Sequence, residues 1–241
     1  MPSDEQQRRR RRWLIAIPIV VLLLAVVGPF VYIHFIQGPA PKPLTLDSAP
    51  AGSTTTAAGS TSASTTGGVA GTWTVTGGSQ AGYRAKEVLF GQDSTAVGRT
   101  SNVTGTVVID GTTVSSAHLT VDLTSIKSDQ DRRDLRYRSV METDTFPNAT
   151  FELTEPIALG TVPAAGTTVK KNATGKMTIH GTTKTVTFPI SAKRSGDTIA
   201  INGTIPVVFA DYGVSNPSFG PATVQDHGEI EFLVVLAKKG T

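Results

Sequence analysis

Apolar and polar residues alternate in short runs along most of the chain from residue 71 to residue 238, and Gly, Asn or Asp residues separate the runs. A period of two predicts half-buried β-strands, because successive side chains of a strand point to opposite faces. A run around Tyr83–Phe90 changes parity at Glu87, which predicts a β-bulge at that position. The regular runs cover residues 103–110, 117–123, 149–154, 176–180, 185–191, 199–207 and 229–236.

About eight strands with one apolar face each predict an all-β domain over residues 71–241. The segments "HGTTK" (His180–Lys184) and "RSGD" (Arg194–Asp197) separate neighbouring runs and predict hairpin turns. The pattern alone fits either two packed sheets or a closed barrel, because both arrangements bury one face of every strand.

Residues 129–141, "DQDRRDLRYRSVM", interrupt the alternation and predict one short helix. Asp129 and Arg133 lie four positions apart, as do Asp134 and Arg138, and this spacing brings opposite charges together on a helix surface. Arg133 and Arg138 are therefore expected mainly to stabilise the helix itself.

The N-terminus holds an apolar run of 24 residues, 13–36, without a formally charged side chain. A helix of this length is about 36 Å long, enough to cross a hydrocarbon layer of roughly 30 Å. Five arginines directly precede it, so residues 1–12 are predicted to be a cytoplasmic tail. A single-pass protein of the cell membrane, with its C-terminal domain outside the cytoplasm, is expected. A cleaved signal peptide is the alternative, but its apolar core usually has only about 7–15 residues.

Residues 37–70 are rich in Pro, Ser and Thr. Such a stretch buries too little apolar surface to offset the entropy lost on ordering. It is predicted to be a disordered linker between the membrane segment and the β domain.

The formal net charge of +3 comes from the N-terminal tail, since residues 71–241 hold sixteen basic and sixteen acidic side chains. A nucleic-acid-binding domain carries its basic excess on the folded domain, so this class of protein is excluded. The chain has no cysteine, which excludes disulfides, thiolate metal sites and a catalytic cysteine.

Motifs for catalysis are also missing: the sequence has no nucleophile elbow, phosphate-binding glycine loop or zinc-binding helix motif. His118, His180 and His227 lack the spacing of metal ligands and are predicted to be solitary and exposed. No catalytic residue, metal site or cofactor is predicted, and the protein is not expected to be an enzyme.

Several segments match a known family pattern in order. They are "RDLRYRS" (Arg133–Ser139) followed by "FPNATFEL" (Phe146–Leu153), "GKMTIHGTTKTVTFPI" (Gly175–Ile190), "ADYGVSNPS" (Ala210–Ser218) and "DHGEIEFLVVLAKK" (Asp226–Lys239). Over residues 71–239 the chain resembles the YceI-like domain, a bacterial polyisoprenoid-binding, lipocalin-like family. It departs from the family pattern at Arg136, where the family has His. The resemblance implies an extended antiparallel eight-stranded barrel that encloses an isoprenoid chain.

On this resemblance, the barrel interior is expected to hold a polyisoprenoid or another long-chain amphiphile. Arg132 and Arg136 have no acidic partner at helical spacing and are the candidates for contact with an anionic headgroup near a barrel mouth. A solvated helix face is the alternative for both. The residues expected to line the barrel are Leu119, Val121, Leu123, Phe151, Met177, Ile179, Phe188, Ile201, Ile230, Phe232 and Val234.

Two other classes of function stay open. A packed core without ligand explains the same apolar rows, and the domain would then be a structural or interaction module displayed on a tether. An enzyme acting on a bound isoprenoid lipid would need a polar cluster inside the barrel, which the pattern does not reveal.

Overall fold

The computed structural model describes residues 39–49 and 68–239, together with positions 17, 18, 21, 27, 28 and 31. The predicted cytoplasmic tail and most of the predicted membrane segment, residues 13–36, lie outside these residues. Within the described part, no helix combines the length and the hydropathy needed to cross a membrane. The transmembrane segment therefore stays a prediction from the sequence.

The strands of the domain follow the alternating runs, and the described residues from 68 onward contain a single α-helix, α2 (Asp131–Val140). Short 3-10 turns are η2 (Leu46–Ser48), η3 (Leu123–Ser125) and η4 (Phe209–Tyr212). The strands are β1 (Gly71–Val75), β2 (Gln80–Leu89), β3 (Gln92–Thr100), β4 (Val103–Asp110), β5 (Thr113–Asp122), β6 (Asn148–Leu153), β7 (Ile157–Ala158), β8 (Thr168–Ile179), β9 (Thr182–Ser195), β10 (Thr198–Val208), β11 (Ala222–Val224) and β12 (His227–Lys238).

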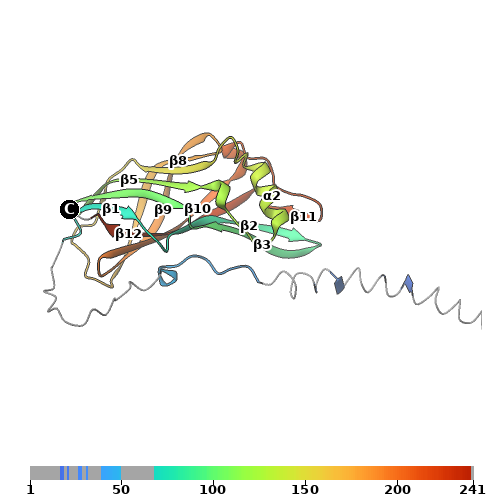
Figure 1. Cartoon of the computed structure of the whole chain (residues 1–241), viewed down its shortest axis with the longest axis horizontal. Helices are drawn as coiled ribbons and strands as arrows, with labels where there is room; N and C mark the ends of the chain where they lie inside the picture. The colour runs from blue at the N-terminus through green and yellow to red at the C-terminus, as the bar shows by residue number, and fades with distance from the viewer. Residues whose placement is uncertain are drawn as a thin grey trace, which may run out of the picture.

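Eight of these strands close into an antiparallel barrel in the order β1–β4–β5–β6–β8–β9–β10–β12. The ring closes where β12 returns to β1, with Trp73 opposite Lys238 and Val75 opposite Leu236. Figure 1 shows α2 at one end of the barrel and the C-terminal end of the chain at the other. The predicted eight-stranded barrel is confirmed, and the alternative of two packed sheets is excluded.

The hairpin of β2 and β3 extends the wall towards the α2 end. Strand β12 pairs with β1 near its C-terminal end and, on the same edge, with β2 nearer its N-terminal end. On its other edge β2 pairs with β3, from Ala81 opposite Thr100 to Leu89 opposite Gln92. This register is continuous, so the bulge predicted at Glu87 is wrong. The parity changes there because a buried carboxylate, and not an apolar residue, occupies an inward position.

Helix α2 is shorter than the predicted segment 129–141, and only one of its two expected ion pairs forms. Arg133 contacts Asp129 as predicted. Asp134 is buried and turns towards the preceding loop, where it accepts a hydrogen bond of 2.8 Å from the Ser128 backbone N–H. The predicted pairing of Asp134 with Arg138 is therefore wrong, because loop donors already engage the carboxylate.

Residues 39–49, here named the strap, pack along the outside of the barrel (Figure 1). Leu44 is buried, its backbone N–H donates to the Glu231 carboxylate over 3.2 Å, and its carbonyl accepts from the Asn202 amide over 3.1 Å. The prediction of a disordered linker is wrong for this stretch. Residues 50–67 of the same predicted linker lie outside the described residues.

Two arginines of the β2–β3 hairpin hold the first part of the strap. Arg84 donates to the Pro41 carbonyl over 2.8 Å, and Arg99 donates to the Lys42 carbonyl. Prolines keep a backbone extended and leave its carbonyls free of internal hydrogen bonds. The strap is therefore held mainly by hydrogen bonds to its backbone. A prediction of order from apolar side chains does not include such bonds.

Candidate functional site

The inward rows of the barrel strands enclose a cavity of about 210 Å³ with an almost entirely apolar wall. Inward and outward side chains alternate along every barrel strand, so the predicted apolar rows face this space. Ten of the eleven residues expected to line the barrel lie on the wall. They are Leu119, Val121, Phe151, Met177, Ile179, Phe188, Ile201, Ile230, Phe232 and Val234. Their contact with a lipid stays a prediction.

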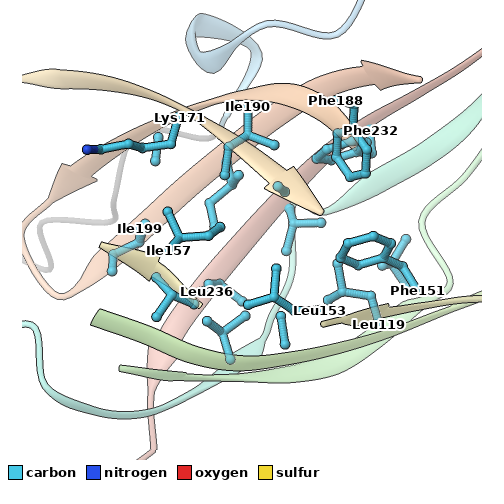
Figure 2. Close-up of a pocket in the computed structure, with 18 of the residues that line it drawn as sticks. Leu119, Phe151, Leu153, Ile157, Lys171, Phe188, Ile190, Ile199, Phe232 and Leu236 are labelled. Atoms are coloured by element: carbon cyan, nitrogen blue, oxygen red, sulfur yellow. The ribbon is translucent and has the colours of Figure 1, made fainter. Parts of the chain in front are cut away.

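Three phenylalanines meet edge to face on the wall of this cavity (Figure 2). The ring centroids are 5.3 Å apart for Phe151 and Phe188, and 5.9 Å apart for Phe188 and Phe232. Two glycines make room for the rings: a Cβ on Gly175 would lie 2.5 Å from the Phe151 ring, and one on Gly203 would lie 2.6 Å from the Phe232 ring. The rings thus pack directly over the backbone of the neighbouring strands.

A second, larger cavity of about 900 Å³ lies between α2, the β2–β3 hairpin and residues 207–224. Leu123, the remaining predicted lining residue, faces this cavity, because the strand ends at Asp122 and Leu123 begins the turn η3. Five residues line both cavities, so the two cavities adjoin each other inside the barrel. These residues are Ala81, Val121, Ala149, Ile179 and Ile230.

A stacked pair of tyrosines lies on the wall of the second cavity. The rings of Tyr83 on β2 and Tyr137 on α2 are almost parallel, with an interplanar angle of 8° and centroids 5.1 Å apart. Burial raises the pKa of both phenols above their ordinary value of 10.0. Both side chains are therefore neutral at physiological pH, and the stack fixes the helix against the hairpin.

An ion pair joins the same two elements one turn away. Arg133 on α2 lies 3.1 Å from the carboxylate of Glu87, which faces the second cavity from β2. Glu87 is buried, and a buried carboxylate without a partner would be strongly unfavourable. Arg133 therefore does more than the predicted stabilisation of its own helix, because it also neutralises a charge on the cavity wall.

The two arginines proposed to contact a headgroup both line the second cavity, but their surroundings differ. Arg132 is exposed and forms neither a hydrogen bond nor an ion pair within the part of the chain that the structure describes. Arg136 donates to the backbone carbonyls of Pro217 and Asn216 over 3.3 and 3.4 Å, and its guanidinium lies 5.9 Å from the Phe219 ring centroid. Arg132 is thus the more available cation at this cavity.

Further cations line the first cavity at the end away from α2. These are Lys171 on β8, and Lys193 and Arg194 on β9. Figure 2 shows the Lys171 side chain extending along the wall, with its ammonium group pointing away from Phe188 and Phe232. None of the three forms an ion pair with a described acidic residue. The apolar space therefore has basic side chains at both ends.

The histidines do not assemble a site, but one of them is not exposed as predicted. The His180 side chain is only 12% exposed, and its Nδ1 lies 3.2 Å from the Tyr212 carbonyl. Its ring also packs edge to face against Phe146 at 4.8 Å. Among the described residues, no three His, Asp or Glu side chains come close enough together to hold a metal ion.

Several polar groups around the cavities were not found from the sequence. Glu87 coincides with a change of parity in its strand, but that change predicts a bulge and not a buried carboxylate. Lys171 occupies an inward position on β8, between Val169 and Ala173, outside the regular run 176–180 that the sequence pattern predicts. No sequence pattern predicts that Tyr83 and Tyr137 stack, because their contact depends on how α2 packs against β2.

An eight-stranded closed barrel with an internal cavity is the architecture of lipocalin-like proteins. Within this class, the chain belongs to the YceI-like domain family. Residues 73–236 match the model of that family. The predicted family resemblance is confirmed. No protein with a curated description matches the chain.

Solved structures resemble this chain at low sequence identity. A polyisoprenoid binding domain from Saccharophagus degradans, implicated in plant cell wall breakdown, is 18% identical with a TM-score of 0.58, and the match covers 69% of this chain and 98% of that one. BcnA of Burkholderia cenocepacia is 25% identical with a TM-score of 0.46, covering 64% and 95% of the two chains. The YceI protein of Campylobacter jejuni is 13% identical with a TM-score of 0.44, covering 60% and 85%.

Proposed function

We propose that this barrel binds the chain of a polyisoprenoid or a similar long amphiphile in its interior. The observation that carries the proposal is the pair of adjoining, largely apolar cavities, of about 210 and 900 Å³. Ligand pockets in proteins have volumes of roughly 300–1,000 Å³, so the space is large enough for a lipid chain. The polyisoprenoid-binding member of the same fold supports this choice of ligand.

Burial of the chain supplies enough free energy for binding with few polar contacts. Each buried methylene contributes about 0.8 kcal/mol, so ten methylenes contribute about 8 kcal/mol before the costs of association. A micromolar complex corresponds to about −8.2 kcal/mol. An isoprenoid longer than ten carbons could therefore bind usefully through the apolar wall alone. A solid core without ligand would instead fill the barrel centre, which the cavities argue against.

The headgroup of the amphiphile would lie at the opening beside α2. Arg132 and Arg136 line that cavity, and a guanidinium suits an anionic group such as phosphate. Because Arg136 is already engaged with loop carbonyls, we assign Arg132 the direct contact and Arg136 the positioning of the loop. The protein then acts by binding and carrying its ligand, not by catalysis.

Residues 13–36 would anchor this carrier in the cell membrane, with the N-terminal arginines in the cytoplasm and the barrel outside. The support is the length of the apolar run and the position of the arginines before it. A carrier fixed beside the bilayer stays close to the compartment in which isoprenoid lipids dissolve.

The decisive experiment is mass spectrometry of lipid extracted from the purified full chain. An isoprenoid or another long-chain amphiphile should be recovered in near-stoichiometric amount. In a variant Ala149→Phe, the added ring would obstruct the junction of the two cavities, and the lipid content should fall severalfold. Ala164→Phe, in the exposed β7–β8 loop, is the matched control. A protein without lipid that also fails to bind added polyprenol would refute the proposal.

A further inference from the structure

We propose that the opening of the second cavity is a docking surface for the phospholipid bilayer. The inference goes beyond ligand binding, because it concerns the face that the barrel turns towards a membrane. It rests on where the exposed apolar side chains lie, on the contacts that join them, and on the position of the strap.

Exposed apolar side chains gather at the α2 end. Between residues 68 and 239, six large apolar side chains are exposed, and five of these lie on the elements that surround the second cavity. Leu135 on α2 is 64% exposed and Phe219 in the η4–β11 loop is 68% exposed. The set at this end is Val88, Phe90, Leu135, Val208 and Phe219, and the remaining side chain, Val162, lies in the β7–β8 loop at the other end. Clustered exposed apolar side chains mark an interaction site.

Direct contacts join the tip of the β2–β3 hairpin, the η4–β11 loop and α2 into one rim around the opening. The Phe90 backbone N–H donates to the Pro221 carbonyl over 3.2 Å, which places the tip of the β2–β3 hairpin against the η4–β11 loop. Phe219, in the same loop, packs against the guanidinium of Arg136 on α2. Phe90, Phe219 and Arg136 also line the cavity itself, so the rim is continuous with the apolar interior.

The rim combines apolar side chains with a cation, as membrane-surface segments do. Arg132 lies one helical turn from Arg136 and Leu135, is exposed, and has no ion pair among the residues that the structure describes. A bilayer surface offers such a side chain a lipid phosphate. A protein partner would need a complementary carboxylate beside an apolar patch, whereas the bilayer interface supplies both requirements at once.

The strap brings the predicted membrane segment to the same end of the barrel. Figure 1 shows the strap running along the outside of the barrel, with its N-terminal part directed towards the α2 end. Arg84, which holds Pro41, also lines the second cavity. The predicted segment 13–36 ends three positions before Pro39, a distance of at most about 11 Å in an extended chain. A bilayer holding that segment would therefore lie beside the rim and far from Val162.

A docked rim would let an isoprenoid chain pass between the bilayer and the barrel without crossing water. The chain would leave the acyl layer between Leu135 and Phe219 and meet the apolar wall of the second cavity. Its phosphate or hydroxyl group would stay at the level of Arg132, beside the lipid headgroups.

The test uses the full chain, which has no native cysteine. Single variants Leu135→Cys and Val162→Cys are labelled with an environment-sensitive fluorophore and incorporated into phosphatidylcholine–phosphatidylglycerol vesicles, some of which carry quencher-labelled lipids. The probe at 135 should shift to the blue and be quenched, whereas the probe at 162 should behave as in solution. Adding Arg132→Gln and Phe219→Ser to the Leu135→Cys chain should remove most of the quenching.

Equal quenching at both positions, quenching at 162 alone, or no quenching at either position would overturn the proposal. The last result would leave the rim available for a protein partner. The vesicles contain no isoprenoid, so the outcome is independent of whether the barrel binds that ligand.

Discussion

The backbone N–H of Leu44 donates a hydrogen bond of 3.2 Å to the carboxylate of Glu231, 187 positions further along the chain. Glu231 lies on the outer face of β12, yet its side chain is only 1% exposed. Arg99 lies 2.7 Å from the same carboxylate and Arg84 lies 3.5 Å from it. The strap thus covers a charged cluster on the outside of the barrel.

A chain beginning at residue 50 should consequently be less stable than one beginning at residue 39. The shorter chain lacks the burial of Leu44 and the hydrogen bonds between the strap and charged side chains. Together these contribute about 2–4 kcal/mol to the free energy of unfolding. Urea unfolding of the two chains measures the difference, and Leu44→Ala in the longer chain should reproduce part of it. Equal midpoints would show that the strap adds no stability.

Gly175→Ala should destabilise the barrel by about 1–3 kcal/mol, the usual cost of forcing an extra group into a packed interior. The new Cβ would lie 2.3 Å from the Glu152 carbonyl and 2.5 Å from the Phe151 ring. Gly77→Ala is the matched control, since a Cβ there meets nothing within 4 Å. Thermal unfolding should separate the two variants, and similar melting temperatures would contradict the crowding seen at Gly175.

The stacked tyrosines predict a loss of stability in alkali. The pKa of Tyr83 and of Tyr137 is raised in the folded protein by burial, so folding favours the neutral phenols. Their contribution is fully present below the unfolded value of about 10 and is lost as the pH rises towards the folded values. Urea midpoints should fall above pH 10, and fall less steeply in Tyr83→Phe. An unchanged slope would mean that Tyr83 does not titrate with unfolding.

Arg132→Gln should leave the melting temperature nearly unchanged, because Arg132 is exposed and forms no hydrogen bond or ion pair with a described residue. Binding of a polyprenyl phosphate should weaken roughly tenfold, as expected for one exposed charge-assisted hydrogen bond. Binding of the neutral polyprenol should hardly change. Lys171→Gln is the matched control, because it removes a cation from the wall of the first cavity, at the end away from α2. A selective loss in Lys171→Gln instead would place the headgroup at that end.

Protease added to intact spheroplasts should remove the barrel domain, since the arginine cluster before residues 13–36 predicts an N-terminus in the cytoplasm. A tag on the N-terminus should stay protected until the membrane is permeabilised with detergent. Protection of the barrel in intact spheroplasts would contradict this topology.

The alternation of side chains determined much of the fold and of the cavity wall. Phe151, Phe188 and Phe232 were assigned to the interior from parity alone, because a strand buries every second residue regardless of which strands become its neighbours. Closure into a barrel is not contained in parity. It depends on β12 returning to β1, a pairing between segments more than 160 positions apart.

The contacts of charged residues could be predicted from the sequence only where both partners lie on the same helix. Asp129 and Arg133 are four positions apart on one helix, and their contact followed from helical geometry. Glu87 pairs with Arg133, and Arg136 binds carbonyls of a loop eighty residues away, only because α2 packs between the β2–β3 hairpin and that loop. The energy of a charge depends on its whole surroundings, and these exist only after folding.

Sequence by itself therefore determined the strand faces, the single helix of the barrel domain, the family and the apolar character of the interior. These properties depend on side-chain periodicity and on contacts within a few residues. Only the tertiary structure decided which arginine is available, where the cavity opens, and that Leu44 is buried against Glu231. Each of these properties depends on groups that are distant in sequence and meet only in the folded protein. The strap is held by backbone hydrogen bonds, which cannot be predicted from the side-chain composition.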